Sequence, residues 1–384
     1  MGLNDFLLGT FNDFPFSNLL TNTLIGRWLF PYSYANRAAD FSYKPNSFLN
    51  LLHPLLQENQ TKPLFLSIHF CLMHYPYVWA ESPAGDFSIR ERYAKSMSIL
   101  DMQVRDFFSL LKESHLLDHA IVVLLSDHGE ALEFPGDRIT EKELFLQNQK
   151  NKAIPLFYPP SLDEEAVNQS AGHGTDVLGL SQYHSLLAFK LYGLGHQQKK
   201  TISGVVSLLD IKPTLLHLLH LPSPKSSGIS LTSIIQGKKQ LVQMRHIFIE
   251  SDFTPKAIQT MYPATRDVML QGVRVFQIDP LTTRLSIKKS MEQMILHTKQ
   301  YADIYGEWML ALYPQDKKSY MPILINLVSG RWTNDLQSSF AQKSPLLSML
   351  DALKIFYSND LNNKSLSYDS KGNTKLSLNI TKLR

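Results

Sequence analysis

The chain has 384 residues, of which 44% are hydrophobic and 19% are charged. This balance excludes a disordered chain, and 18 glycines with 20 prolines are too few for a collagen-like protein. The 38 basic and 34 acidic residues leave a net charge of +4, which is too small to indicate a nucleic-acid partner. We therefore expect a globular protein that binds no nucleic acid.

Cysteine content and hydrophobic runs restrict the class further. Cys71 is the single cysteine of the sequence, which excludes an internal disulfide and a zinc site built on several thiolates. The longest aliphatic runs, such as residues 120–125, are far shorter than the roughly 20 residues that cross a bilayer. The sequence thus predicts no transmembrane segment. Residues 1–20 contain no Lys or Arg, so they predict no signal peptide, and the localisation stays open.

Strands alternate with helices in the first part of the chain. Residues 1–60 predict an irregular N-terminal segment. Short apolar runs bounded by turn or charged residues then predict buried parallel strands at 64–70, 120–125, 186–192 and 246–250. Helical patterns lie between these runs. We therefore expect an α/β domain over 61–240, with a mostly parallel sheet flanked by helices.

Two helices are predicted with defined starts. Apolar side chains between residues 89 and 112 recur at spacings of four and three, which places them on one helix face. Ser88 followed by Glu91 predicts a capping box at the start of this helix. The second helix is expected to begin at Asp210, because Pro213 is tolerated in a first turn and Pro222 would end the helix.

The pattern changes beyond residue 240. Strand-like runs separated by turn residues predict two hairpins, one over 275–287 and one over 308–328. We therefore expect a smaller antiparallel subdomain at 241–358. Residues 359–384 are dominated by Asn, Ser, Lys and Thr, and they predict a disordered polar tail.

Polar groups that follow the predicted strands are the candidates for chemistry. Asp127 and His128 come directly after a predicted strand, where Gly129 lets the backbone turn so that both side chains can meet one cation. His74 follows another predicted strand, and His173 lies between two glycines. Ligands bind at the carboxyl ends of parallel strands. We therefore expect His74, Asp127, His128 and His173 to face one cleft.

Each candidate also has a plain structural interpretation. Asp127 would cap the following helix beside a solvated His128, His74 would pack within its aromatic-proline loop, and His173 would lie in a flexible turn. The residues alone leave these alternatives open.

The order and spacing of these groups resemble the sulfatase family of the alkaline phosphatase superfamily. The H-Y-P-Y stretch at 74–77 is similar to the family's H-x-P-Y substrate loop, and S-D-H-G-E at 126–130 is similar to its metal segment. The stretch S-L-L-D-I-K-P-T-L-L at 207–216 matches a helix of the family, and H-G at 173–174 resembles an element of the lipid-modifying phosphotransferase branch. The resemblance covers about residues 60–225.

The resemblance implies a metal-dependent hydrolase of sulfate or phosphate esters. Asp127 and His128 would be metal ligands, while His74 and His173 would bind the ester oxygens or protonate the leaving group. The implied cofactor is a divalent metal ion, Zn²⁺, Mn²⁺ or Ca²⁺, and an imidazole ligand favours the first two. The implied substrate is a small-molecule, lipid or glycan ester. The H-G element favours an alternative, a phosphoglycerol or phosphoethanolamine transferase.

The sequence departs from the family at the nucleophile. No C-x-P-S-R motif is present, Cys71 has a different context, and residues 1–60 contain no apolar strand that ends in paired acids. Three accounts follow: an N-terminally truncated family member, a catalytically silent pseudoenzyme or binding scaffold, and an enzyme with a relocated nucleophile. We expect the first. Generic monoesters should then react near the uncatalysed rate, while weakened metal binding persists.

Overall fold

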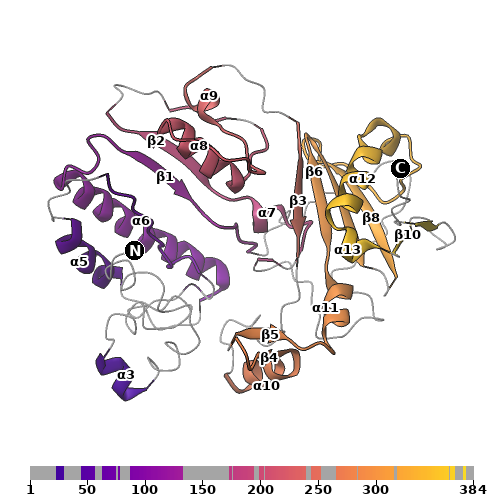
Figure 1. The fold of residues 1–384 in the computed structure, drawn as a ribbon, viewed down its shortest axis with the longest axis horizontal. Coiled ribbons are helices and arrows are strands. Elements are labelled where there is room, and N and C mark those ends of the chain that lie inside the picture. Colours follow the sequence, from indigo (N-terminus) through magenta and orange to yellow (C-terminus); the bar gives the residue numbers. More distant parts are fainter. Residues whose placement is uncertain are drawn as a thin grey trace. The chain divides into compact units, whose positions relative to one another are not determined.

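A computed structural model of the chain describes residues 23–29, 45–56, 63–74, 77, 87–132, 173–174, 176–193, 199–202, 204–238, 244–251, 265–282, 284–314, 318–362, 364–367 and 375–377. Two compact units divide the chain. The first holds Met1–Val122 and Lys190–Gln197, and the second holds Val123–Phe189 and Gln198–Arg384. The domain boundaries expected from the sequence stay a prediction. Figure 1 labels the helices and strands of both units.

Helices dominate the first unit: α3 (Leu24–Leu29), α5 (Pro45–Leu56) and α6 (Ile89–Glu113). The predicted capping box of α6 is confirmed, because Ser88 Oγ accepts a hydrogen bond from Glu91 N and the Glu91 carboxylate accepts one from Ser88 N. Apolar side chains of α5 and α6 form one core cluster, which includes Leu52, Phe107 and Leu111. The predicted apolar face of α6 is therefore buried at Phe107 and Leu111 in its second half, whereas Met97 in its first half is exposed.

The predicted strand at 64–70 is wrong. Residues 63–70 form no strand, and the side chains of Leu64, Phe65 and Leu66 are exposed. A short apolar run favours a strand only when a neighbouring strand pairs with it, and none of the described strands pairs with this segment.

The next two predicted strands exist, but their direction was predicted wrongly. β1 (Ile121–Leu125) and β2 (Leu187–Leu191) form a two-stranded sheet. Ser126 N donates to Leu186 O at one end, and Tyr192 N donates to Ala120 O at the other, so the strands run antiparallel. An apolar run reports burial and does not report the direction of the partner strand.

A seven-stranded sheet in the second unit has the order β11-β10-β8-β7-β6-β3, with β9 paired to β8. Its strands are β3 (His246–Glu250), β6 (Tyr301–Tyr305), β7 (Trp308–Pro314), β8 (Ser319–Asn326), β9 (Trp332–Thr333), β10 (Ser365–Ser367) and β11 (Lys375–Ser377). Every pairing is antiparallel except that of β10 with β8. The α/β class is therefore retained, while a mostly parallel sheet is not what the described residues form.

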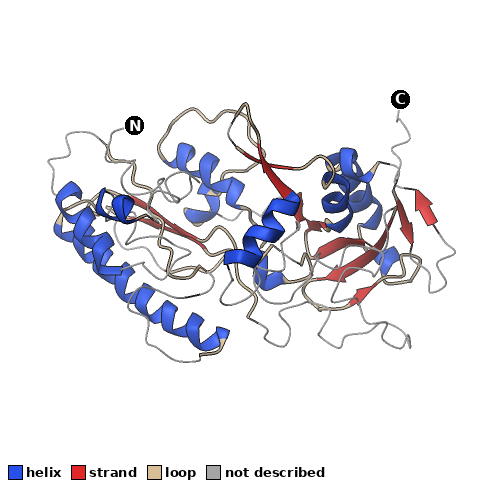
Figure 2. Cartoon of the chain, turned by 90° about the horizontal axis from the view of Figure 1, so that it is seen from below, coloured by secondary structure: helices blue, strands red, loops and turns tan. Residues whose placement is uncertain are grey.

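Both faces of this sheet are buried. Along β7, Leu310 and Leu312 belong to one core cluster, whereas Met309 and Ala311 belong to the other, as the period of two in a strand requires. Helix α12 (Leu346–Phe356) covers the first face, to which it contributes Met349, Leu350 and Leu353. Figure 2 shows helices packed beside the strands of this sheet. The predicted hairpin over 308–328 is confirmed as β7 and β8.

Short elements complete the second unit: α7 (Leu180–Tyr183), α8 (Ile211–Leu218), α9 (Thr232–Ile235), α10 (Thr265–Val275), α11 (Glu292–Thr298), α13 (Ser358–Leu361), β4 (Phe276–Ile278) and β5 (Leu285–Ile287). β4 and β5 confirm the predicted hairpin over 275–287. β10 and β11 lie within the stretch predicted as a polar tail. In the part of the chain that the structure describes, no helix is both long and apolar enough to cross a membrane.

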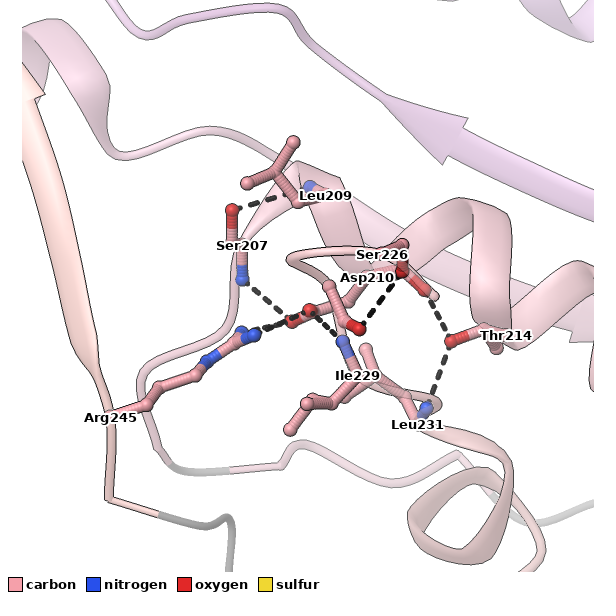
Figure 3. A network of polar contacts seen from close by, with 9 residues as sticks. Ser207, Leu209, Asp210, Thr214, Ser226, Ile229, Leu231 and Arg245 are labelled. Atoms are coloured by element: carbon pink, nitrogen blue, oxygen red, sulfur yellow. Dashed lines mark hydrogen bonds and ion pairs between the residues drawn. The ribbon is translucent and has the colours of Figure 1, made fainter. Parts of the chain in front are cut away.

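The predicted start of α8 is confirmed, because Asp210 is its N-cap residue. Asp210 is also the centre of a hydrogen-bond network. Its buried carboxylate accepts hydrogen bonds from Ser207 N and Ile229 N, each at 2.9 Å. Arg245 donates to the same carboxylate through both Nη atoms (Figure 3). This network fastens the start of α8 to the segment that leads into β3.

Candidate metal centre

The segment 126–130 follows β1 and is held against α7. Ser126 N donates to Leu186 O at 3.1 Å, and Gly129 N donates to Gln182 O at 3.0 Å. A Cβ atom on residue 129 would lie 2.0 Å from Ser181 O, so only glycine allows this close approach. The backbone between His128 and Glu130 is thereby fixed.

A second segment brings His173 to the same place. Gly174 has a φ of +70°, which glycine adopts without strain and which turns the chain directly after His173. Two residues further on, the buried carboxylate of Asp176 accepts hydrogen bonds from Leu178 N and from the hydroxyl of Tyr313 on β7. Val177 N donates to Gln300 Oε1 at 2.9 Å. The turn that carries His173 is thus anchored to the large sheet.

His128, Glu130 and His173 form a compact cluster. Nδ1 of His173 lies 3.0 Å from one carboxylate oxygen of Glu130 and 3.3 Å from the other. The rings of His128 and His173 stack with centroids 3.8 Å apart and an interplanar angle of 25°. One potential ligand atom from each residue lies within 4.8 Å of the others. The Glu130 side chain is 7% exposed, against 35% for His128 and 33% for His173.

Hydrogen bonds define which ring nitrogen of each histidine carries the lone pair. Nδ1 of His128 lies 2.8 Å from Gly129 O, and a carbonyl oxygen only accepts, so Nδ1 carries the hydrogen. The carboxylate of Glu130 imposes the same tautomer on His173. In the neutral rings, Nε2 therefore carries the lone pair, which is the state required of a metal ligand.

Glu130 also shifts the pKa of its neighbour His173. Its hydrogen bond raises the pKa of His173, its negative charge and that of Asp127 act in the same direction, and burial opposes them. His173 is consequently a stronger proton acceptor than an isolated histidine. The ring can hold a proton against an anionic ligand, or it can offer Nε2 to a metal once the proton has left.

Three of the four residues predicted from the sequence lie in this region. Asp127 is next to the cluster, with a side chain that is 76% exposed and an Oδ1 atom 3.7 Å from Nε2 of His128. His74 belongs to the other unit, where its N–H donates to Cys71 O, so its place in a shared cleft stays a prediction. Glu130 was missed as a site residue, although it is the last residue of the S-D-H-G-E stretch.

The donor set of the cluster fits a divalent metal ion. Two imidazoles and one carboxylate, whose ligand atoms lie within 4.8 Å of one another, suit Zn²⁺ or Mn²⁺, whereas Ca²⁺ prefers oxygen ligands throughout. Two ligands bound tetrahedrally to one zinc ion lie about 3.4 Å apart, because each bond is near 2.1 Å. The 3.7 Å between Asp127 Oδ1 and His128 Nε2 is close to that separation.

Comparisons with known proteins identify the family of the chain. A family model described as Sulfatase matches residues 9–221, which is more than half of the chain. Lipoteichoic acid synthase 2 of Bacillus subtilis (strain 168) is 28% identical over 149 residues, which cover 35% of this chain and 22% of that protein. Lipoteichoic acid synthase 1 of the same organism is 26% identical over 132 residues, with 32% and 20% covered. The matches thus span about a fifth of these relatives.

Two phosphonate monoester hydrolases are among the solved structures that match part of the chain. The enzyme SpPMH from Silicibacter pomeroyi has a TM-score of 0.42 and 15% identity, with 71% of this chain and 41% of that chain covered. The enzyme of Agrobacterium radiobacter has a TM-score of 0.38 and 15% identity, with 71% and 42% covered.

Proposed function

This chain belongs to the Sulfatase family, and we propose that it binds a divalent metal together with a sulfate or phosphate ester, as a metal-dependent ester hydrolase. The observation that carries the proposal is the cluster of His128, Glu130 and His173. It comes from segments 43 residues apart in the sequence, which converge after β1. The two stacked imidazoles are about one third exposed, so they do not serve as buried core packing. Their Nε2 atoms can therefore be reached by a ligand.

We assign Asp127, His128 and His173 as the metal ligands. The sequence suggested His173 for the ester oxygens, but its bond to Glu130 leaves Nε2 available to the metal instead. The backbone carbonyl of Gly129 holds the His128 ring with Nε2 available as a ligand, and the Glu130 carboxylate holds His173 in the same way. Partners of this kind orient ligating histidines and raise their basicity. When bound, the metal would withdraw negative charge from the ester oxygens. His74 is retained from the sequence as a candidate for binding those oxygens.

A second candidate function is transfer of a phosphoglycerol or phosphoethanolamine group to an acceptor other than water. The matches to two lipoteichoic acid synthases favour it. Hydrolysis and group transfer both require a metal ion beside the charged ester, so the cluster is compatible with either function. They differ in the acceptor, so the products distinguish them. A third account from the sequence, a silent binding protein, predicts ester binding without turnover.

Calorimetry on metal-free and Mn²⁺-loaded chain, with inorganic phosphate as the probe, tests the proposal. We expect phosphate to bind only with metal present, and the His128→Ala variant to lose this binding. His115→Ala is the matched control, because His115 pairs with Asp118 on the exposed surface. Phosphate binding of equal strength with and without metal would contradict the proposal. Because the sequence identifies no nucleophile, we expect p-nitrophenyl phosphate and sulfate to react near the uncatalysed rate. Release of p-nitrophenol above the rate of His128→Ala would identify a hydrolase whose nucleophile the sequence analysis missed.

A further inference from the structure

A serine, a histidine and an aspartate lie in line on the face of the large sheet that α12 covers. Ser348 Oγ lies 3.3 Å from Nε2 of His246, and Nδ1 of the same ring lies 2.7 Å from Oδ2 of Asp303. The three residues come from α12, β3 and β6, which are neighbouring elements in the second unit (Figure 1). None of them belongs to the candidate metal centre.

Strand register explains why these side chains meet. β3 pairs antiparallel with β6, so that His246 lies opposite Tyr305 and Phe248 lies opposite Asp303. Phe248 and Tyr305 pack against the core cluster that α12 completes, which places His246 and Asp303 on that same face by the period of two. The rings of His246 and Tyr305 stack with their centroids 4.4 Å apart, and this contact also fixes the orientation of the imidazole.

The proton order along the line is the one that activates a serine. A carboxylate only accepts, so Asp303 fixes the hydrogen of His246 on Nδ1. Nε2 then accepts the hydroxyl proton of Ser348. This is the arrangement of nucleophile, base and orienting acid, which is identified by geometry and not by sequence position. The 3.3 Å between Ser348 Oγ and His246 Nε2 is slightly longer than an ideal hydrogen bond, as is common in catalytic sites without bound substrate.

Burial decreases from the acid to the nucleophile. The Asp303 side chain is fully buried, His246 is 26% exposed, and Ser348 is exposed. Burial raises the pKa of Asp303 to about 6, while the hydrogen bond with His246 acts in the opposite direction. The Asp303 carboxylate lies 2.7 Å from Nδ1, where it can stabilise the imidazolium that forms when His246 takes a proton.

Backbone donors are available beside the serine. Ser348 is the third residue of α12, and the N-cap residue Pro345 gives no side-chain hydrogen bond to the first turn. The N–H groups of Leu346, Leu347 and Ser348 have no acceptor within the helix. Such donors at a helix N-terminus stabilise negative charge, including the charge that develops on a carbonyl oxygen under attack.

We propose that Ser348, His246 and Asp303 form a second active site that hydrolyses carboxylic esters. Ser348 Oγ bonds to the carbonyl carbon as its proton passes to His246 Nε2. The bond to the leaving alcohol then breaks, and the alcohol takes that proton. Water releases the acid from Ser348 by the same route in reverse. A neutral ester fits better than a phosphate ester, because the buried carboxylate of Asp303 beside His246 disfavours a negatively charged ester.

The test uses the full chain treated with EDTA, so that it is independent of the proposed metal function. A fluorophosphonate probe with peptide mass spectrometry locates the reactive serine, and p-nitrophenyl acetate measures turnover. We expect the label on Ser348 and ester turnover that persists in EDTA. Ser348→Ala should lose both, and Asp303→Asn should slow both. Ser109→Ala, an exposed helical serine, and Asp351→Asn, an exposed acid on α12, should react as the unaltered chain does.

Two results would overturn the proposal. One is the absence of any label on Ser348 in the folded chain. The other is turnover that Ser348→Ala leaves unchanged. In either case the line of three residues would serve only to fasten α12 to β3 and β6. Ser348 is exposed, so its alanine variant is expected to fold, and a thermal melt verifies this.

Discussion

Asp210 and Glu130 are both carboxylates withdrawn from water, yet their partners differ in kind. Asp210 is saturated by two backbone N–H groups and by both Nη atoms of Arg245 (Figure 3). Glu130 bonds to the ring of His173, which stacks on His128 near the surface. An arginine partner stays charged and only fixes the structure, whereas a histidine partner can lose its proton and offers a second nitrogen. The side chain bonded to a buried carboxylate therefore indicates its role: arginine marks a structural carboxylate, and histidine marks one in a candidate functional site.

The largest effect on stability should come from Asp210. Asp210→Ala leaves Arg245 and two N–H groups without their acceptor, so we expect the free energy of unfolding to fall by about 3–5 kcal/mol. Urea unfolding measures this change. Asp351→Ala removes an acid whose side chain is 71% exposed and should change stability by less than about 0.5 kcal/mol. Equal effects of the two variants would contradict the structural role of Asp210.

Glu130 should affect metal binding more than stability. Glu130→Gln keeps an acceptor for His173 and removes the charge, so we expect the affinity for Zn²⁺ or Mn²⁺ to fall about 10- to 100-fold. Calorimetric titration measures the affinity, with Glu113→Gln, an exposed glutamate at the end of α6, as the control. If Glu130→Gln destabilised the fold as much as Asp210→Ala and left metal affinity intact, the two carboxylates would share one structural role.

The pair of Glu130 and His173 should make the stability of the chain depend on pH. In the metal-free chain, Glu130 raises the pKa of His173 above its value of about 6.5 in the unfolded chain. The stability that the pair contributes is therefore fully present below about pH 6.5 and is lost as the pH rises through the folded pKa. Urea unfolding near pH 6 and near pH 8 measures this loss, which should shrink in Glu130→Gln.

Asp127 should show the smallest effect on stability. Its side chain is 76% exposed, so Asp127→Asn is expected to change the free energy of unfolding by less than about 0.5 kcal/mol. The same variant should weaken Zn²⁺ binding, because an amide is a poorer ligand than a carboxylate. A destabilisation comparable to that of Asp210→Ala, seen by urea unfolding, would show that Asp127 is a structural acid too.

Local features were predictable from the sequence because the residues that cause them are neighbours. The capping box of Ser88 and Glu91, the start of α8 at Asp210 and both hairpins follow from such patterns. The direction of β1 and β2 was not predictable, since burial gives no information on the orientation of a partner strand. Nor did 64–70 form a strand, because an apolar run needs a pairing partner.

The candidate site was predictable in part for the same reason. Asp127 and His128 are adjacent, and their position after a strand indicated a ligand site. The pairing of Glu130 with His173 depends on a turn anchored through Asp176 to Tyr313, 137 residues further along the chain. No local pattern reports such a contact. The line of Ser348, His246 and Asp303 likewise depends on strand register and on the docking of α12.

Titration of Zn²⁺ into the metal-free chain, followed by calorimetry, tests the metal centre most directly. The unaltered chain should bind with a saturable isotherm, and the double variant His128→Ala/His173→Ala should lose this binding. His115→Ala, which removes a surface histidine paired with Asp118, should bind as the unaltered chain does. An unchanged isotherm in the double variant would show that the cluster of His128, Glu130 and His173 is not the metal site.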